Sequence, residues 1–217
     1  MEYDEKRIRL AERLREELNL SDRVYNAIKK VPRHLFVPER YRSEAYADTP
    51  LPIGYGQTIS APHMVAIMCE LLELKEGEKV LEVGTGCGYH AAVTAELVGS
   101  RGMVVSIERI PELAEIAKRN LSSLGYDNVL VVVGDGSLGY SEEAPYDKIY
   151  VTASAPDVPK PLIDQLRVGG KMVIPIGESY QTLYIVEKEE NRVTKKRWGS
   201  VRFVLLYGEH GFRNSEE

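Results

Sequence analysis

The spacing of hydrophobic residues changes near residue 78, from a helical period to a pattern of buried strands. Before that point, apolar residues recur every three or four positions, which predicts an amphipathic helix over roughly the first twenty residues. Ser21 is a typical N-cap and predicts the start of a second helix. Pro32 and Pro38 end that helix. The stretch DTPLPIGYG then predicts a loop, and residues 64–74 predict a third helix.

After residue 78, short apolar strands alternate with helices. We predict strands at 79–84, 103–108, 128–134, 146–153 and 171–177, and helices at 90–99, 111–125 and 159–170. The tail predicts a β-hairpin that turns at Glu190–Asn191. Strands that are apolar throughout are typical of a parallel sheet covered on both faces. We therefore expect an α/β fold with a doubly wound, mostly parallel, seven-stranded Rossmann-like sheet. An antiparallel C-terminal edge and an N-terminal helical segment complete it.

Length and composition narrow the class of protein. The 217 residues are 43% hydrophobic and 28% charged, as in ordinary globular proteins. We divide them into a helical segment with a substrate loop (1–75) and a ligand-binding α/β domain (76–217), packed as one unit. No apolar run approaches the roughly 20 residues of a membrane span, and the net charge of −5 disfavours nucleic acid. The two cysteines form no metal-ligand cluster. We expect a cytoplasmic monomer that binds no membrane, nucleic acid or metal.

A glycine-rich loop, LEVGTGCGYH, directly follows the first strand of the α/β domain. Gly84, Gly86 and Gly88 allow positive φ and a close approach of a ligand to the backbone. The spacing G-x-G-x-G differs from the dinucleotide pattern G-x-G-x-x-G, because Tyr89 stands where its last glycine would be. Glu108 ends the next strand, 20 residues after Gly88, where an acid can accept both hydroxyls of a ribose. A solvated acid at a strand end is the alternative for Glu108 alone.

Two further acids and the absence of bases favour one cofactor. Glu82 ends the first strand and is predicted to meet an ammonium group. Asp135, in the sequence GDGS, follows the third strand and is predicted to meet an adenine amino group. The glycine loop contains no Lys or Arg for phosphates. A ligand with an adenosine, an ammonium and no phosphate fits these features, which predicts S-adenosylmethionine. The motifs resemble those of class I S-adenosylmethionine-dependent methyltransferases.

A longer stretch resembles one family in particular. VPRHLFVP, GQTISAPHM, the glycine loop, and GDGS followed by PYDKIYVTA stand in the order typical of the protein-L-isoaspartate (D-aspartate) O-methyltransferase family. This resemblance runs from about Val31 to the final strands. It implies methylation of the stray carboxylate of L-isoaspartyl residues in damaged proteins and peptides, and of D-aspartyl residues in some members. The ester then collapses to a succinimide, whose hydrolysis restores some normal aspartate.

The resemblance also implies roles for individual residues. By position, Ser60 matches the family's active-site serine. Four residues match the loop that lines substrate and cofactor: Gln57, Thr58, Ile59 and His63. The cofactor site is predicted to comprise Glu82, Gly84, Thr85, Gly86, Gly88, Glu108, Arg109, Asp135 and Gly136.

The chemistry agrees with a hydroxyl at the acceptor site. A carboxylate with a reference pKa near 4 is already a nucleophile at neutral pH, so no general base is needed. The sulfonium is already activated, so no metal is needed. An Arg clamp on this carboxylate would stabilise the ground state more than the transition state, in which both charges fade. Ser60 can orient the acceptor without that cost. The alternative for Ser60 is a helix N-cap, and for His63 a structural or surface role.

Other functions stay open at this point. A methyltransferase for RNA or a small molecule is the first alternative, although VTASAPDVPKP stands where an Asn/Asp-Pro-Pro-Tyr motif would be expected. The second alternative is a binding module that keeps the cofactor fold without catalysis. For the leading hypothesis we expect main-chain contacts to the substrate peptide from the 54–64 loop and from residues near 175–177 and 204–206.

Overall fold

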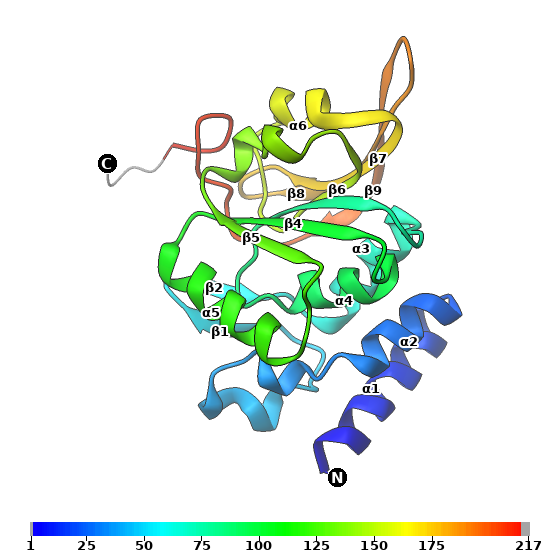
Figure 1. Ribbon diagram of the computed structural model, residues 1–217, viewed down its shortest axis with the longest axis vertical. Coiled ribbons are helices and arrows are strands. Elements are labelled where there is room, and N and C mark those ends of the chain that lie inside the picture. Colours follow the sequence, from blue (N-terminus) through cyan, green and yellow to red (C-terminus); the bar gives the residue numbers. More distant parts are fainter. Residues whose placement is uncertain (1, 214–217) are drawn as a thin grey trace.

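A seven-stranded sheet forms the centre of the computed structural model, which describes residues 2–213 (Figure 1). Its strands lie in the order β5-β4-β3-β6-β7-β8-β9. Their bounds are Lys79–Val83 (β3), Met103–Glu108 (β4), Val129–Val133 (β5), Tyr146–Val151 (β6), Leu166–Ile176 (β7), Gln181–Lys188 (β8) and Val193–Val201 (β9). The pairings from β5 to β7 are parallel, whereas β8 runs antiparallel to both β7 and β9. The predicted sheet and its antiparallel C-terminal edge are confirmed.

Helices cover both faces of this sheet because successive side chains on each strand point to opposite sides. On β3, Val80 belongs to one hydrophobic cluster and Leu81 to another. The first cluster joins one face to five helices: α1 (Glu2–Leu18), α2 (Asp22–Lys30), α3 (Pro62–Leu72), α4 (Tyr89–Val98) and α5 (Pro111–Ser123). The second joins the other face to α6 (Lys160–Gln165). The Ser21 hydroxyl accepts a hydrogen bond from the Val24 N–H, as predicted for the N-cap of α2.

The segment predicted as a loop before α3 contains a small β-hairpin instead. Leu51–Gly54 (β1) pairs antiparallel with Gln57–Ile59 (β2). Tyr55 and Gly56 at the tip both have positive φ, which suits the tight turn of a two-residue hairpin. The strands are only four and three residues long and include a proline, so their alternation is too short to predict a strand.

The predicted end of the helix at 159–170 and the predicted start of the strand at 171–177 are also corrected. The helix predicted at 159–170 ends at Gln165, and LRVGG begins β7. Its glycines are weak helix formers, and pairing with β6 decides the conformation. The hairpin turn at Glu190–Asn191 is confirmed, and the orange hairpin projects from the molecule (Figure 1). Beyond Val201 the chain leaves the sheet, and an isolated bridge joins Leu205 to Ser154.

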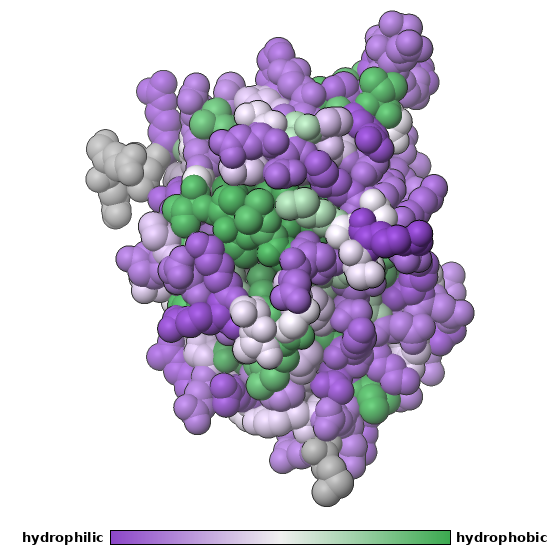
Figure 2. Space-filling view, in the orientation of Figure 1, coloured by the Kyte–Doolittle hydropathy of each residue, from purple (hydrophilic) through white to green (hydrophobic). Residues whose placement is uncertain are grey.

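Most of the face seen in Figure 1 is hydrophilic. Figure 2 shows a hydrophobic area on this face where β4 and β5 lie. Leu130 and Val133 of the edge strand β5 are exposed. Within the described chain, no helix has both the length and the apolar character needed to cross a membrane.

Polar side chains are buried between the sheet and helix α4. Glu82 is fully buried. The Ser106 hydroxyl donates to its Oε2, whereas Oε1 has no hydrogen-bond partner within residues 2–213. The His90 ring packs tilted against Tyr150, with 4.2 Å between ring centroids and an interplanar angle of 33°, and its Nδ1 is likewise unpartnered in that range. Burial raises the pKa of Glu82 to about 8 and lowers the pKa of His90 to about 3, so both groups are neutral over much of the pH range.

Replacing Glu82 by glutamine is expected to make stability less sensitive to pH. The pKa of Glu82 rises from 4.5 to about 8 on folding, so its proton stabilises the folded chain fully below pH 4.5. That stabilisation is lost as the pH rises through 8. Glu82→Gln lacks this titration, so its melting temperature relative to that of the wild type should rise as the pH increases from about 5 to about 9. Each kcal/mol of unfolding free energy that the wild type loses over this range corresponds to about 2–4 °C in melting temperature. Calorimetry would measure this shift.

Glu16→Gln is the matched control, because Glu16 is exposed on α1. This control should follow the wild-type stability at each pH. Parallel loss of stability in wild type and Glu82→Gln would contradict the expected titration of Glu82.

Candidate active site

The hairpin β1–β2 lies directly against the glycine loop. Leu51, Ile53 and Ile59 are buried, while Thr58 on the opposite side of the strand is exposed. A Cβ at Gly86 would stand 3.1 Å from Ile53 Cδ1. Together with its positive φ of 55°, this tight packing of Ile53 favours glycine at position 86, and it places the hairpin beside the loop that follows β3.

The first glycine of the loop permits a close approach between β3 and β6. Gly84 has a φ of 98°, and a Cβ there would stand 2.3 Å from Thr152 Oγ1. The Thr152 hydroxyl donates to the carbonyl oxygens of Gly84, at 2.8 Å, and Val83, at 3.0 Å. Thr152 follows β6 directly, so the carboxyl ends of two neighbouring strands are joined where ligands bind in open α/β sheets.

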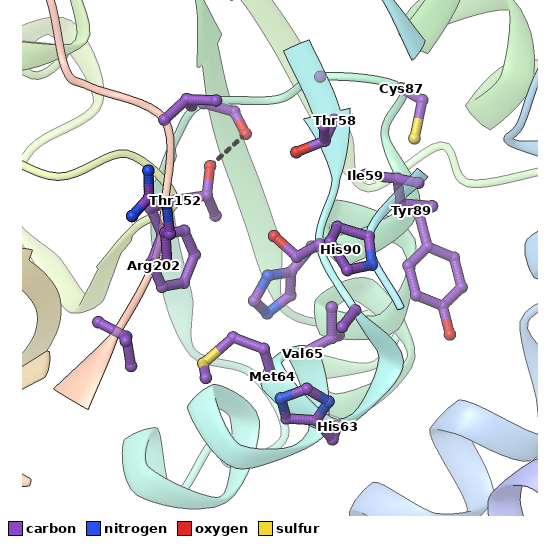
Figure 3. Close-up of a pocket in the computed structure, with 18 of the residues that line it drawn as sticks. Thr58, Ile59, His63, Met64, Val65, Cys87, Tyr89, His90, Thr152 and Arg202 are labelled. Atoms are coloured by element: carbon purple, nitrogen blue, oxygen red, sulfur yellow. Dashed lines mark hydrogen bonds between the residues drawn. The ribbon is translucent and has the colours of Figure 1, made fainter. Parts of the chain in front are cut away.

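Two cavities meet at this point. A larger cavity of about 660 Å³ lies between the hairpin, the start of α3 and the residues after β9 (Figure 3). A smaller cavity of about 80 Å³ adjoins it near the end of β4. The residues that line both, and so mark their junction, are Thr58, Gly84, Gly86, Thr152 and Val204.

Most of the predicted site residues line these cavities. The larger cavity brings together the predicted residues Thr58, Ile59, Ser60, His63, Gly84, Thr85 and Gly86. The smaller cavity adds Gln57, Glu108, Arg109 and Gly136. Three others line neither cavity: Glu82, Gly88 and Asp135. The fold therefore brings residues 57–63 together with the strand ends around these two cavities.

Ser60 connects β2 to α3. The N-cap of α3 is Ala61, and no side chain of that residue caps the helix, so the alternative that Ser60 serves as the cap is wrong. Pro62 occupies the first turn, as predicted. The Ser60 hydroxyl makes no hydrogen bond to residues 2–213 and lines the larger cavity. It can therefore donate to a ligand there.

His63 is held by a carboxylate from the preceding loop. Asp48 Oδ1 accepts a hydrogen bond from the His63 backbone N–H at 2.9 Å and lies 3.0 Å from the ring Nδ1. Asp48 thus binds the first turn of α3 from outside the helix and supplies the acceptor that Ala61 lacks. A proton on Nδ1 leaves Nε2 as the ring atom open to a ligand. The signal for Asp48 was absent from the sequence pattern, because it lies in a segment without periodicity.

Glu108 supports the glycine loop from the end of β4. Its Oε2 accepts from the Gly86 N–H at 2.8 Å and its Oε1 from the Ile110 N–H at 2.9 Å. Glu108 is 7% exposed, and burial raises its pKa from the ordinary value. Each oxygen retains a lone pair for a hydroxyl in the smaller cavity. Glu108 is therefore a buried, hydrogen-bonded acid, and the alternative of a solvated acid at the strand end is wrong.

Asp135 binds the C-terminal segment. Its Oδ1 accepts from the Ser137 N–H and hydroxyl at 2.8 and 2.7 Å, and its Oδ2 accepts from the Glu209 N–H at 2.7 Å. A Cβ at Gly208 would stand 2.1 Å from Asp135 Oδ1. The structure thus places the Asp135 carboxylate under the turn at 208–209, and Gly136 is its neighbour that lines the smaller cavity.

Glu82 reaches the glycine loop only through other side chains. The Thr85 hydroxyl lies 2.6 Å from the Ser106 hydroxyl, which donates to Glu82. Gly88 precedes α4 and packs against α5, with Leu121 Cγ 3.2 Å from where a Cβ would be. These positions give Glu82 and Gly88 supporting contacts in the core.

Several lining residues were not predicted from the sequence. Thr152 was detectable, because it follows a predicted strand. Arg202 comes from the tail after β9, where no motif marked it, whereas Val204 belongs to the segment 204–206 that was predicted to contact the peptide. The guanidinium of Arg109, a predicted residue, lies 5.6 Å from the Tyr207 ring centroid. His90 lines the larger cavity from the first turn of α4. No group of three or more potential metal ligands occurs within residues 2–213.

Comparison with known proteins identifies this arrangement. The model of the protein-L-isoaspartate(D-aspartate) O-methyltransferase family matches residues 5–211. Protein-L-isoaspartate O-methyltransferase 1 of Archaeoglobus fulgidus is 78% identical over 217 residues, which is 100% of both chains. A solved protein-L-isoaspartate O-methyltransferase superposes with a TM-score of 0.88 and 35% identity, covering 94% of this chain and 67% of the other.

A second solved structure carries a cofactor product. It is a Plasmodium falciparum beta-aspartate methyltransferase in complex with S-adenosyl-L-homocysteine, with a TM-score of 0.82 and 32% identity. The match covers 93% of this chain and 98% of the other. The chain belongs to the protein-L-isoaspartate(D-aspartate) O-methyltransferase family, whose members use S-adenosylmethionine.

Proposed function

We propose that this protein transfers the methyl group of S-adenosylmethionine to the free carboxylate of L-isoaspartyl residues in damaged proteins and peptides. The observation that carries this proposal is the junction of the two cavities at Thr58, Gly84, Gly86, Thr152 and Val204. One cavity contains an unpartnered serine hydroxyl, and the other contains a buried acid. A donor and an acceptor bound on the two sides would meet at the junction.

The larger cavity suits an acceptor that is already a nucleophile. No Asp, Glu or Lys is among the described residues that line it, so no carboxylate is placed to act as a general base. A substrate carboxylate needs none, because it is ionised near neutral pH. Ser60 donates a hydrogen bond that orients one carboxylate oxygen. Alignment of the acceptor oxygen, methyl carbon and sulfur by the whole site, of which this hydrogen bond is one part, can contribute roughly 7–11 kcal/mol to lowering the barrier.

We assign the adenosine part of the cofactor to the side of the site that the smaller cavity marks. Glu108 accepts hydroxyl hydrogens, and the glycine loop leaves space for a ligand against the backbone. When bound, S-adenosylmethionine supplies an activated methyl group on a sulfonium. The cavity volume of about 80 Å³ is below the ~300–1,000 Å³ of typical ligand pockets. The adenosine therefore needs more room than the smaller cavity alone provides.

The remaining roles are proposals that follow from the same reaction. Gln57, Ile59 and His63 contact the substrate or cofactor, and main-chain groups near 204–206 bind the peptide. Residues 175–177, predicted alongside them, line neither cavity. We also propose that the protein acts as a monomer. A cytoplasmic location is supported by the two free, buried cysteines, which suit a reducing compartment. The names of the relatives favour isoaspartyl polypeptides over RNA or a small molecule.

The direct test uses methyl-labelled S-adenosylmethionine and two peptides that differ only in L-isoaspartyl or L-aspartyl at one position. Base-labile label is expected on the isoaspartyl peptide alone, because only its geometry presents the carboxylate beside Ser60. Cofactor binding is measured separately by titration calorimetry. No label on either peptide, with the cofactor bound, would exclude the proposed acceptor.

Ser60→Ala and Glu108→Gln are expected to change different parameters: the turnover number in the first variant and the affinity for the cofactor in the second. Ser60→Ala removes a hydrogen bond to a charged acceptor, so kcat should fall roughly ten- to a hundredfold with the cofactor Kd nearly unchanged. Glu108→Gln replaces a charged acceptor in the smaller cavity, so the cofactor Kd should rise by roughly tenfold or more. Steady-state kinetics and titration calorimetry separate the two effects.

Ser60→Thr serves as the control for the hydroxyl, and it should retain more activity than Ser60→Ala. The reverse pattern would reject these assignments: weaker cofactor binding in the serine variant, with lower turnover alone in the glutamate variant.

Asp48→Ala is expected to act through His63. Loss of the carboxylate releases the His63 ring and the first turn of α3, so KM for the isoaspartyl peptide should rise by about tenfold with a small change in cofactor Kd. In a His63→Ala background the same substitution should have little further effect, because the two residues are coupled. Asp48→Asn keeps an acceptor oxygen and should lie between. Additive effects in the double variant would show that Asp48 acts independently of His63.

A further inference from the structure

Arg202 is the only permanently charged residue among the described residues that line the larger cavity. The other titratable groups there are His63, paired with Asp48, and the buried side chains of Cys87, Tyr89 and His90. Among the described residues that line the cavity, the guanidinium is therefore the one fixed charge, while the Asp48 carboxylate lies behind His63. A cavity with one fixed positive charge and no fixed negative charge favours anionic ligands.

The Arg202 guanidinium has no partner of its own. It is exposed and makes no ion pair or hydrogen bond to residues 2–213. Neighbouring bases differ in this respect: Lys195 pairs with Asp157 at 3.2 Å and Arg192 with Glu189 at 2.7 Å. All five donors of Arg202 therefore remain open to a ligand.

The backbone around Arg202 is fixed. Val201 and Phe203 on either side pack against the hydrophobic core. The buried Gln181 side chain accepts from the Phe203 N–H at 2.6 Å and donates to the Phe203 carbonyl at 3.0 Å. Because both neighbours are anchored, Arg202 is held at the end of β9 beside the cavity.

The position of Arg202 argues against a direct role on the reacting carboxylate. Figure 3 shows Arg202 on the opposite side of the cavity from Thr58 and Ile59, the residues that precede Ser60. A guanidinium on the reacting carboxylate would also stabilise the ground state more than the transition state, where the negative charge fades. Arg202 is better placed for a second anionic group on the same substrate.

We propose that Arg202 forms a subsite for an acidic side chain that adjoins the isoaspartyl residue, so that the enzyme favours damaged sites with a neighbouring Asp or Glu. This inference rests on the proposed function, because it requires a polypeptide in the larger cavity. The overall charge of −5 would otherwise repel acidic substrates. Residues 192–202 contain five bases and no acid, which extends the positive potential along β9 from the subsite.

The test uses isoaspartyl peptides that differ at one neighbouring residue, Glu, Gln or Lys, placed before the isoaspartyl residue in one set and after it in another. For wild type, kcat/KM should be about two- to fivefold higher for Glu than for Lys in at least one set at low salt. The ratio should shrink at high ionic strength because the side chain is exposed.

Variants of Arg202 should change this ratio in a defined direction. Arg202→Gln should bring the Glu-to-Lys ratio close to one, and Arg202→Glu should reverse it. Arg119→Gln is the matched control, since Arg119 is exposed on α5, outside both cavities, and changes the net charge equally. It should keep the wild-type ratio.

Two results would overturn the subsite. One is a wild-type ratio near one in both sets while the neutral isoaspartyl peptide is methylated. The other is an equal loss of kcat in Arg202→Gln on every peptide with the ratio unchanged, which would assign Arg202 to the reacting carboxylate. Failure of wild type to label even the neutral isoaspartyl peptide would instead overturn the proposed function.

Discussion

A side chain at position 84 would collide with Thr152, and the site depends on the close approach that this glycine permits. The Thr152 hydroxyl joins the end of β6 to the glycine loop after β3 through the Gly84 carbonyl. That contact places the junction of the two cavities at the carboxyl ends of adjacent parallel strands. The hairpin β1–β2 then covers the junction, because Ile53 packs where Gly86 has no side chain.

Carboxylates hold the loops around this junction. Glu108 binds the glycine loop, Asp48 binds the first turn of α3, and Asp135 binds the C-terminal turn. Each accepts hydrogen bonds from backbone N–H groups that no strand or helix would otherwise satisfy. The same bonds position Gly86, His63 and the C-terminal wall of the smaller cavity. Loop rigidity and site geometry therefore arise from the same few contacts.

The polar residues of the site differ in how directly they can act. Ser60 and Arg202 present unpartnered donors to the larger cavity, whereas Glu82 is buried behind Ser106 and Thr85. A buried acid with a pKa of about 8 is mostly neutral near pH 7. It supports the loop through hydrogen bonds without adding a full charge to the core.

The sequence by itself determined the sheet, because apolar strands alternating with helices leave few arrangements that bury both faces. It also pointed to Gly84, Gly86 and Glu108, since strand ends and short motifs are local signals, whereas Ser60 was singled out by the family resemblance. Only the tertiary structure decided the contacts between distant segments. The hairpin β1–β2 was too short to predict, and Asp48 and Arg202 carry no motif. Asp135 binds a turn more than seventy residues away. Such pairings depend on packing between separate elements, which local spacing does not encode.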